Sequence, residues 1–227
     1  MRVKIKMVIN KKIINKLEQE AKKYFEGASG CHDWSHIERV NKIALAIGKK
    51  EGADLTILRV AALLHDIGRK EEMENHGLFC HAEKGGEMAR EILKKYKIKD
   101  DLIDKIVHCI KTHRFRGGNI PESIEAKILF DADKLDSIGA VGVARTFLFS
   151  GNAGSNCLYT GNEKKLSKLN KDFSFTKEDS AILEYEVVLK KIKDKVLTRT
   201  GKKIATNRHN FMKKFFERFW EEVKGKR

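Results

Sequence analysis

A histidine followed directly by an aspartate ends the most apolar segment of the chain. His65 and Asp66 come after LRVAALL and before IGRK, so the sequence places an ionisable pair at the end of an apolar helix. Burying such a pair is costly unless another group compensates its charge, and a bound metal ion does this efficiently. The alternative is a carboxylate paired with Arg69 or Lys70. The dipeptide alone is weak evidence, because His32–Asp33 repeats it.

Three blocks of sequence give this pair a context. They are HDWSHIERV at 32–40, AALLHDIGRK at 61–70 and KILFDADKLDSIGAVGVAR at 127–145. In this order they resemble the HD superfamily of metal-dependent phosphohydrolases. The segment TGKKIATNRHNFMKKFFERFW is similar to the tail of a compact bacterial and archaeal branch of that superfamily. The resemblance covers most of the chain and is specific for fold and metal, whereas it says little about the substrate.

The resemblance implies a metal site built from four side chains. In this superfamily an early histidine, the adjacent His–Asp pair and a later aspartate converge on the ion. The matching residues here are His36, His65, Asp66 and Asp133. Asp133 rather than Asp131 fits the late A-D-[RK]-L pattern. This mixed nitrogen and oxygen set suits a divalent Mn, Fe, Co, Ni or Mg ion better than a closed thiolate zinc site. The metal would activate a bound water, and Asp66 would orient that nucleophile through its second oxygen.

Further histidines bear on the number of metal ions. The segments CHAEKGG and IKTHRFRGG resemble the extra histidine positions of dinuclear HD proteins, in which His81 and His113 would share Asp66 with the first ion. In mononuclear relatives the same positions line the pocket. The number of ions, one or two, is therefore left open. His32 and Asp33 are expected to orient the early metal-binding histidine, since metal-bound imidazoles usually need a hydrogen-bonding partner.

A phosphate substrate also needs cationic side chains near the metal. Lys134 directly follows a predicted ligand and is expected to contact a substrate oxygen during catalysis. Asp136 is expected to act as a general base or to cap its helix. The predicted substrate-binding cations are Arg145, Arg69 and Arg114. The alternative for each cation is a solvated surface position or an ion pair.

Together, the residues and the resemblance predict a phosphohydrolase that acts on a nucleotide or another small phosphate ester. Two alternatives stay open. A di-iron oxygenase, a chemistry that some HD-fold proteins use, would need both His81 and His113 as ligands. In a signalling or nucleic-acid-binding module, the metal site would be structural or vestigial. Residues 180–227 carry 14 basic and six acidic residues, which weakly favours a nucleic-acid partner without any recognisable binding motif.

The elements expected to position these residues are helices, so we predict an all-α protein. Apolar residues recur at steps of three and four along most of the chain. Asp54 is predicted to cap the helix that ends in His65–Asp66, and Pro121 to lie in the first turn of a later helix. The expected helices cover residues 13–24, 33–50, 55–68, 82–96, 100–112, 121–136, 138–149, 176–197 and 201–223.

We expect all 227 residues to form one domain. Its core, about residues 28–150, would be an HD-type helical bundle that holds the metal. Residues 151–175 are rich in Gly, Asn and Ser and lack a period, which indicates a long loop. Residues 176–225 would form a C-terminal helical pair packed on the bundle, with Thr176 and Asp179 resembling a capping box.

Composition narrows the class of protein. With 41% hydrophobic and 35% charged residues the chain is typical of a globular protein rather than a disordered one. Its apolar runs are far shorter than the roughly 20 residues of a membrane-spanning helix, and no signal peptide is visible. None of the four cysteines forms a C-x-x-C pair, which argues against a zinc knuckle or a redox pair. From the missing export signal and the short apolar runs we expect free thiols, a cytoplasmic location and no membrane partner. The net charge of +15 is compatible with an anionic substrate or with a lysine-rich surface. The oligomeric state is left open.

Overall fold

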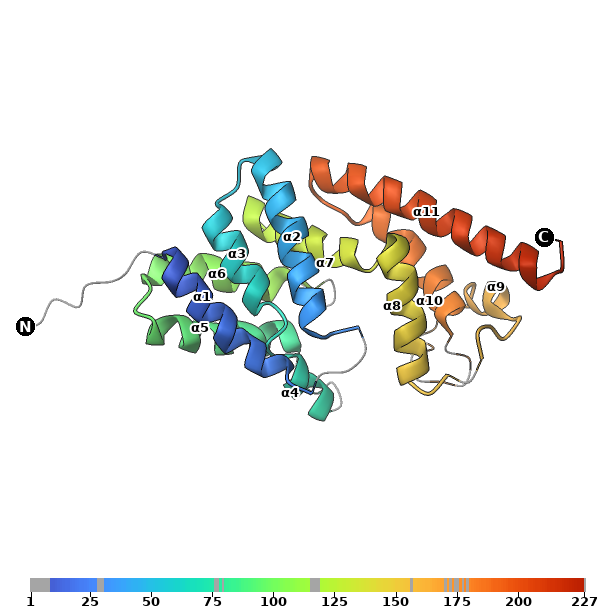
Figure 1. Ribbon diagram of the computed structural model, residues 1–227, viewed down its shortest axis with the longest axis horizontal. Helices are drawn as coiled ribbons and strands as arrows, with labels where there is room; N and C mark the ends of the chain where they lie inside the picture. The colour runs from blue at the N-terminus through green and yellow to red at the C-terminus, as the bar shows by residue number, and fades with distance from the viewer. Residues whose placement is uncertain are drawn as a thin grey trace, which may run out of the picture. The chain divides into compact units, whose positions relative to one another are not determined.

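Helices form every regular element in the part of the chain that the structure describes. The computed structural model describes residues 9–27, 31–75, 78, 80–114, 119–155, 157–169, 171, 173, 176, 178 and 180–226. No strand occurs in these residues, which confirms the all-α class (Figure 1). None of the helices in the described ranges is long and apolar enough to cross a membrane.

The chain forms two compact units. The first comprises Met1–Ala28 and His32–Asp133, and the second comprises Ser29–Cys31 and Lys134–Arg227. The boundary therefore lies inside one helix, α7 (Ile124–Asp136). The expectation of one domain, with a helical pair packed on a bundle, stays a prediction.

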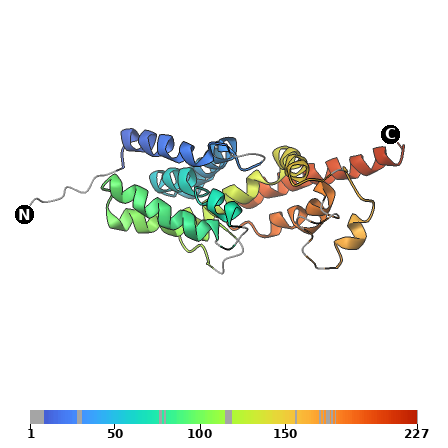
Figure 2. The ribbon, with the colours of Figure 1, turned by 90° about the horizontal axis from the view of Figure 1, so that it is seen from below.

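The first unit is a helical bundle built around its most apolar segment. Besides most of α7, its elements are α1 (Lys11–Lys22), η1 (Lys23–Phe25), α2 (Trp34–Glu51), α3 (Leu55–Leu64), α4 (Arg69–Glu74), α5 (His81–Lys95) and α6 (Asp100–Thr112). Helix α3 contacts α1, α2 and α6, while α5 lies along α6 (Figures 1 and 2). Seven of the ten residues of α3 are buried, which explains why its sequence is apolar on nearly all sides.

Local capping sets the ends of the two helices that lead to the predicted metal site. Asp54 accepts hydrogen bonds from the backbone N–H groups of Thr56 (2.8 Å) and Ile57 (3.2 Å), which confirms its predicted role at the start of α3. Helix α2 ends at Gly52, whose φ of 73° is left-handed and favours glycine. The prediction for Pro121 is wrong, because α7 begins three residues later, at Ile124.

The second unit contains the C-terminal half of the chain. Its elements after α7 are α8 (Gly139–Asn152), α9 (Glu163–Leu166), α10 (Ala181–Val187), η2 (Leu189–Asp194) and α11 (Arg199–Val223). Helix α11 contacts α8 and η2, and α10 contacts α8, α9 and η2. Aromatic rings join α8 to α11, since Phe147 stacks with Phe216 at a centroid distance of 6.4 Å. The predicted loop 151–175 holds one short helical turn, α9.

The predicted helix over 176–197 is wrong in length. Helix α10 starts after Ser180, whose hydroxyl accepts a hydrogen bond from the Leu183 N–H at 3.1 Å. The chain then changes to the 3₁₀ helix η2, which places Leu189 and Ile192 on one buried side because 3₁₀ side chains three residues apart align. The predicted capping box cannot be compared, since Asp179 lies outside the described residues.

Candidate metal centre

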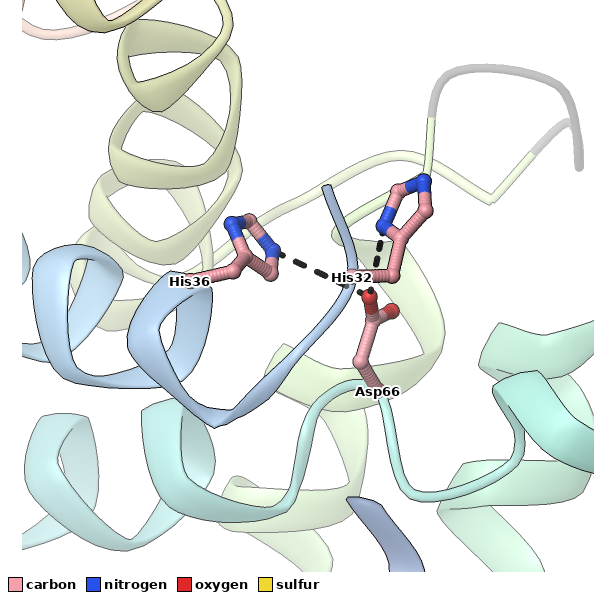
Figure 3. Close-up of side chains that lie close together, drawn as sticks. All are labelled: His32, His36 and Asp66. Atoms are coloured by element: carbon pink, nitrogen blue, oxygen red, sulfur yellow. Dashed lines mark ion pairs between the residues drawn. The ribbon is translucent and has the colours of Figure 1, made fainter. Parts of the chain in front are cut away.

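The carboxylate of Asp66 is the centre of a cluster of histidines in the first unit, all of them buried except the half-buried His32. Asp66 is only 1% exposed, and its Oδ2 lies 3.8 Å from His36 Nε2, 3.8 Å from His32 Nδ1 and 3.9 Å from His65 Nε2. Figure 3 shows the rings of His32 and His36 directed at this oxygen. His36 Nε2 also lies 3.5 Å from Asp133 Oδ1. The four predicted ligands are therefore brought together around one point.

The other oxygen of Asp66 faces a second pair of histidines. Its Oδ1 lies 3.4 Å from the Nε2 atoms of both His81 and His113, and these two nitrogens are 3.2 Å apart. The Nδ1 atoms of the same rings point away from Asp66, toward Glu72 Oε2 (2.7 Å) and the Ile110 carbonyl (2.5 Å). Because these oxygens can only accept, each Nδ1 is the donor, and the other ring nitrogen, Nε2, is the atom that faces Asp66. Imidazole nitrogens and carboxylate oxygens are both ligands of divalent cations, so these three atoms form a second candidate site.

His65 provides the clearest test of whether these residues fit a metal ion. Its Nδ1 donates to the Ala62 carbonyl at 2.8 Å, which leaves Nε2 as a lone pair facing Asp66. That Nε2 is buried without a hydrogen-bond partner among the described residues. Burial lowers the pKa of His65 from 6.5 to about 4, so the ring is neutral at pH 7, as a metal ligand must be. An orphaned, neutral imidazole nitrogen beside a carboxylate fits a divalent cation.

Three overlapping groups in the described residues have ligand atoms close enough to hold an ion. Within each group these atoms lie within 4.8 Å of one another. The groups are His32, His36 and Asp66; His36, His65 and Asp133; and His65, Asp66 and His113. Asp133 belongs to one of these groups and Asp131 to none.

The charges around Asp66 keep it ionised. Burial acts to raise the pKa of Asp66, whereas the Arg69 guanidinium has the largest opposing effect, and that pKa lies well below its usual value. Arg69 Nη2 lies 3.2 Å from Oδ1 and 3.1 Å from Oδ2 of Asp66, and its Nη1 lies 3.4 Å from Glu72 Oε2. Arg114 Nη1 donates to the other Glu72 oxygen. The structure therefore places two predicted substrate-binding arginines at the edge of the cluster.

Local structure explains how these side chains reach one point. Asp33 caps α2 by accepting a hydrogen bond from the His36 N–H at 3.3 Å, so it fixes the backbone of His36. His65 and His113 follow the last residues of α3 and α6, whereas His81 is the first residue of α5. The cluster thus forms where helix ends meet.

Glu72 is a residue of this site that the sequence does not single out. It contacts Arg69, His81 and Arg114, yet it lies in the acidic run EEME, in which no spacing distinguishes one acid from another. Burial acts to raise the pKa of Glu72, but hydrogen bonds from His81 and Arg114 lower it to about 2. Glu72 is therefore a carboxylate at neutral pH.

The remaining predicted residues belong to the second unit. Asp136 is 1% exposed and accepts a hydrogen bond from Arg145 Nη1 at 2.5 Å, while Arg145 Nη2 donates to the Cys31 carbonyl at 2.9 Å. Lys134 is half-buried in α7. The geometry of Asp136 and Arg145 matches the ion-pair alternative. The roles of Lys134, Asp136 and Arg145 in catalysis or substrate binding stay predictions.

Known proteins resemble this chain along most of its length. A family model for the HD domain matches residues 33–138. The protein YpgQ of Bacillus subtilis is 33% identical over 201 residues, which cover 87% of this chain and 87% of YpgQ. The crystal structure of YpgQ in complex with ADP has 30% sequence identity and a TM-score of 0.72, and the match covers 94% of this chain and 100% of that one.

A second solved structure gives the same result. The crystal structure of an HD-superfamily hydrolase from Bacillus thuringiensis has 29% sequence identity and a TM-score of 0.70. The match covers 94% of this chain and 97% of that one. Both structural relatives therefore share nearly the full length of the fold, and the matched HD region includes His36, His65, Asp66 and Asp133.

Proposed function

Because this chain belongs to the HD superfamily of hydrolases, we propose that it is a metal-dependent phosphohydrolase that cleaves a nucleotide or another small phosphate ester. The observation that carries the proposal is the convergence of buried imidazole nitrogens on both oxygens of the ionised Asp66. The complex of YpgQ with ADP supports a nucleotide as the ligand, since a relative of the same length binds a phosphorylated small molecule.

In this proposal His36, His65, Asp66 and Asp133 hold a divalent ion. Two imidazoles and two carboxylates form a donor set that suits Mn, Fe, Co, Ni or Mg. When bound, such an ion lowers the pKa of a coordinated water and polarises a phosphoryl oxygen.

The protein side chains then bind and orient the substrate. Arg69 and Arg114 offer guanidinium groups to phosphoryl oxygens at the edge of the cluster, where they offset the negative charge that develops during the attack of water. Asp66 keeps its negative charge through the pairing with Arg69. The proposal also includes Lys134 and Arg145 as further contacts to phosphate and Asp136 as a general base. These three roles rest on the sequence motifs alone.

A second ion is part of the proposal on the Oδ1 side of Asp66. His81 and His113 present their Nε2 atoms 3.2 Å apart and each 3.4 Å from Asp66 Oδ1, an arrangement of ligand atoms that suits a shared cation. The number of ions also separates the hydrolase from its alternative. A di-iron oxygenase requires two iron ions per chain, whereas phosphate release with a redox-inactive ion such as Mg²⁺ is a hydrolase reaction.

The proposal is tested by metal analysis together with phosphate release. The wild-type protein is assayed with Mn²⁺, Co²⁺, Ni²⁺ and Mg²⁺ on nucleoside mono-, di- and triphosphates and on sugar phosphates. We expect metal-dependent release of phosphate or pyrophosphate that disappears in Asp66→Ala. Asp101→Ala is the matched control, because Asp101 is an exposed residue in the first turn of α6. Equal release by the wild type and Asp66→Ala, or no release with any ion, would contradict the proposal.

A further inference from the structure

We infer that Glu72 is a positioning residue that determines which ring nitrogen of His81 faces Asp66. Glu72 lies on α4 with a side chain that is only 13% exposed, and its Oε2 accepts a hydrogen bond from His81 Nδ1 at 2.7 Å. The inference deepens the proposed function and rests on it for its consequence, the binding of a metal ion by His81. Its first step concerns the position of a ring proton, which can be observed without any metal.

The position of His81 in its helix explains why a side chain is needed. His65 and His113 both lie just after a helix, so each Nδ1 donates to a carbonyl three residues earlier, at Ala62 and at Ile110. His81 is instead the first residue of α5, so its own helix has no carbonyl three residues earlier. Glu72 supplies the missing acceptor.

The hydrogen bond to Glu72 decides the tautomer of His81. A neutral imidazole carries one proton, and a carboxylate can only accept. The proton therefore stays on Nδ1, which leaves Nε2 as a lone pair 3.4 Å from Asp66 Oδ1 and 3.2 Å from His113 Nε2. Without Glu72 the proton would move to Nε2, where Asp66 Oδ1 can accept it. The atom that faces the cluster would then be a donor, unable to bind a metal ion.

Glu72 also offsets the positive charge beside His81. Arg114 Nη1 donates to Glu72 Oε1 and lies 3.3 Å from His81 Nδ1, and Arg69 Nη1 lies 3.4 Å from Glu72 Oε2. The carboxylate thus stands among two guanidinium groups and one imidazole. A negative partner behind the ring makes Nε2 a stronger electron donor, which is the usual effect of a carboxylate on a metal-binding histidine.

The first experiment measures the tautomer of His81 by ring ¹⁵N NMR in the metal-free protein. We expect Nδ1–H in the wild type and a shift to Nε2–H in Glu72→Leu. Glu72→Gln should keep Nδ1–H, because the amide oxygen still accepts a hydrogen bond. Glu74→Leu is the matched control, since Glu74 is an exposed acid of the same helix that contacts Lys70 at 3.9 Å. A wild-type His81 with Nε2–H, or an unchanged tautomer in Glu72→Leu, would overturn the inference.

The second experiment measures Mn²⁺ binding by calorimetry with the same variants. Glu72→Leu should weaken the binding of the ion held by His81 by about 10- to 100-fold, Glu72→Gln less, and Glu74→Leu not at all. If the wild type and Glu72→Leu bind Mn²⁺ equally well, the inference fails while the proposed function stands. If the wild type binds no metal, the proposed function fails, and the NMR result alone decides the role of Glu72.

Discussion

Gly68 lies where the segment after Asp66 touches α5, and replacing it should disturb the cluster. A Cβ atom added at Gly68 would lie 2.6 Å from the Gly85 nitrogen and 2.6 Å from the His81 carbonyl oxygen. Both atoms belong to the backbone of α5, so no side-chain rotation can relieve the clash. Reaching ordinary contact at 3.4 Å requires the two segments to separate by 0.8 Å, the difference between these two distances.

The expected cost of Gly68→Ala follows from this overlap. Forcing an extra carbon into a packed contact costs about 1–3 kcal/mol of the free energy of unfolding. For a chain of this size each kcal/mol lowers the melting temperature by about 2–4 °C. His81 begins α5, so its Nε2 should move away from Asp66 Oδ1, and Mn²⁺ binding should weaken together with stability. Thermal unfolding followed by circular dichroism and Mn²⁺ calorimetry measure the two effects.

Gly85→Ala is the matched control on the other side of the same contact. Its added Cβ would lie 3.4 Å from the His65 carbonyl oxygen and 3.5 Å from the Gly68 nitrogen, which is ordinary contact. Alanine is also favoured over glycine inside a helix by up to about 1 kcal/mol. The control should therefore melt at or above the wild-type temperature. The reasoning is refuted if Gly68→Ala melts like the wild type, or if both substitutions lower the melting temperature equally.

Three further predictions use other parts of the structure. Because burial lowers the pKa of His65 to about 4, the unfolded protein binds more protons than the folded one between pH 6.5 and 4. The free energy of unfolding of the metal-free protein, measured in urea, should therefore fall as the pH is lowered from 6.5 to 4. A flat profile would contradict this. Arg145→Met breaks the ion pair with the buried Asp136 and should cost about 3 kcal/mol in urea unfolding. Unchanged stability with a raised KM would instead favour substrate binding. Gly52→Ala should lower the free energy of unfolding by about 1 kcal/mol, because the φ of 73° is unfavourable for alanine and nothing lies within 4 Å of the added Cβ. An unchanged melting temperature would refute this.

Local signals made parts of the fold predictable. Asp54 and Gly52 act through hydrogen bonds and dihedral angles within a few residues, so their types alone predict where α3 begins and α2 ends. The predictions for Pro121 and for residues 176–197 failed because the local sequence at both places allows more than one helix boundary. At Pro121 the fixed φ allows a helix start but does not require one, and α7 begins at Ile124 instead.

By itself the sequence determined the all-α class and the set of residues expected at the metal. Both follow from patterns that can be recognised in the sequence, the helical periodicity and the order of the HD blocks. Only the tertiary structure decided how those residues face one another. The division of Asp66 between two sets of histidines, and the contact of Glu72 with Arg114 across 42 residues, depend on side chains brought together by packing. The spacing of residues along the chain does not show which oxygen of Asp66 faces which histidine nitrogen. That arrangement depends on where the helix ends meet in the folded protein.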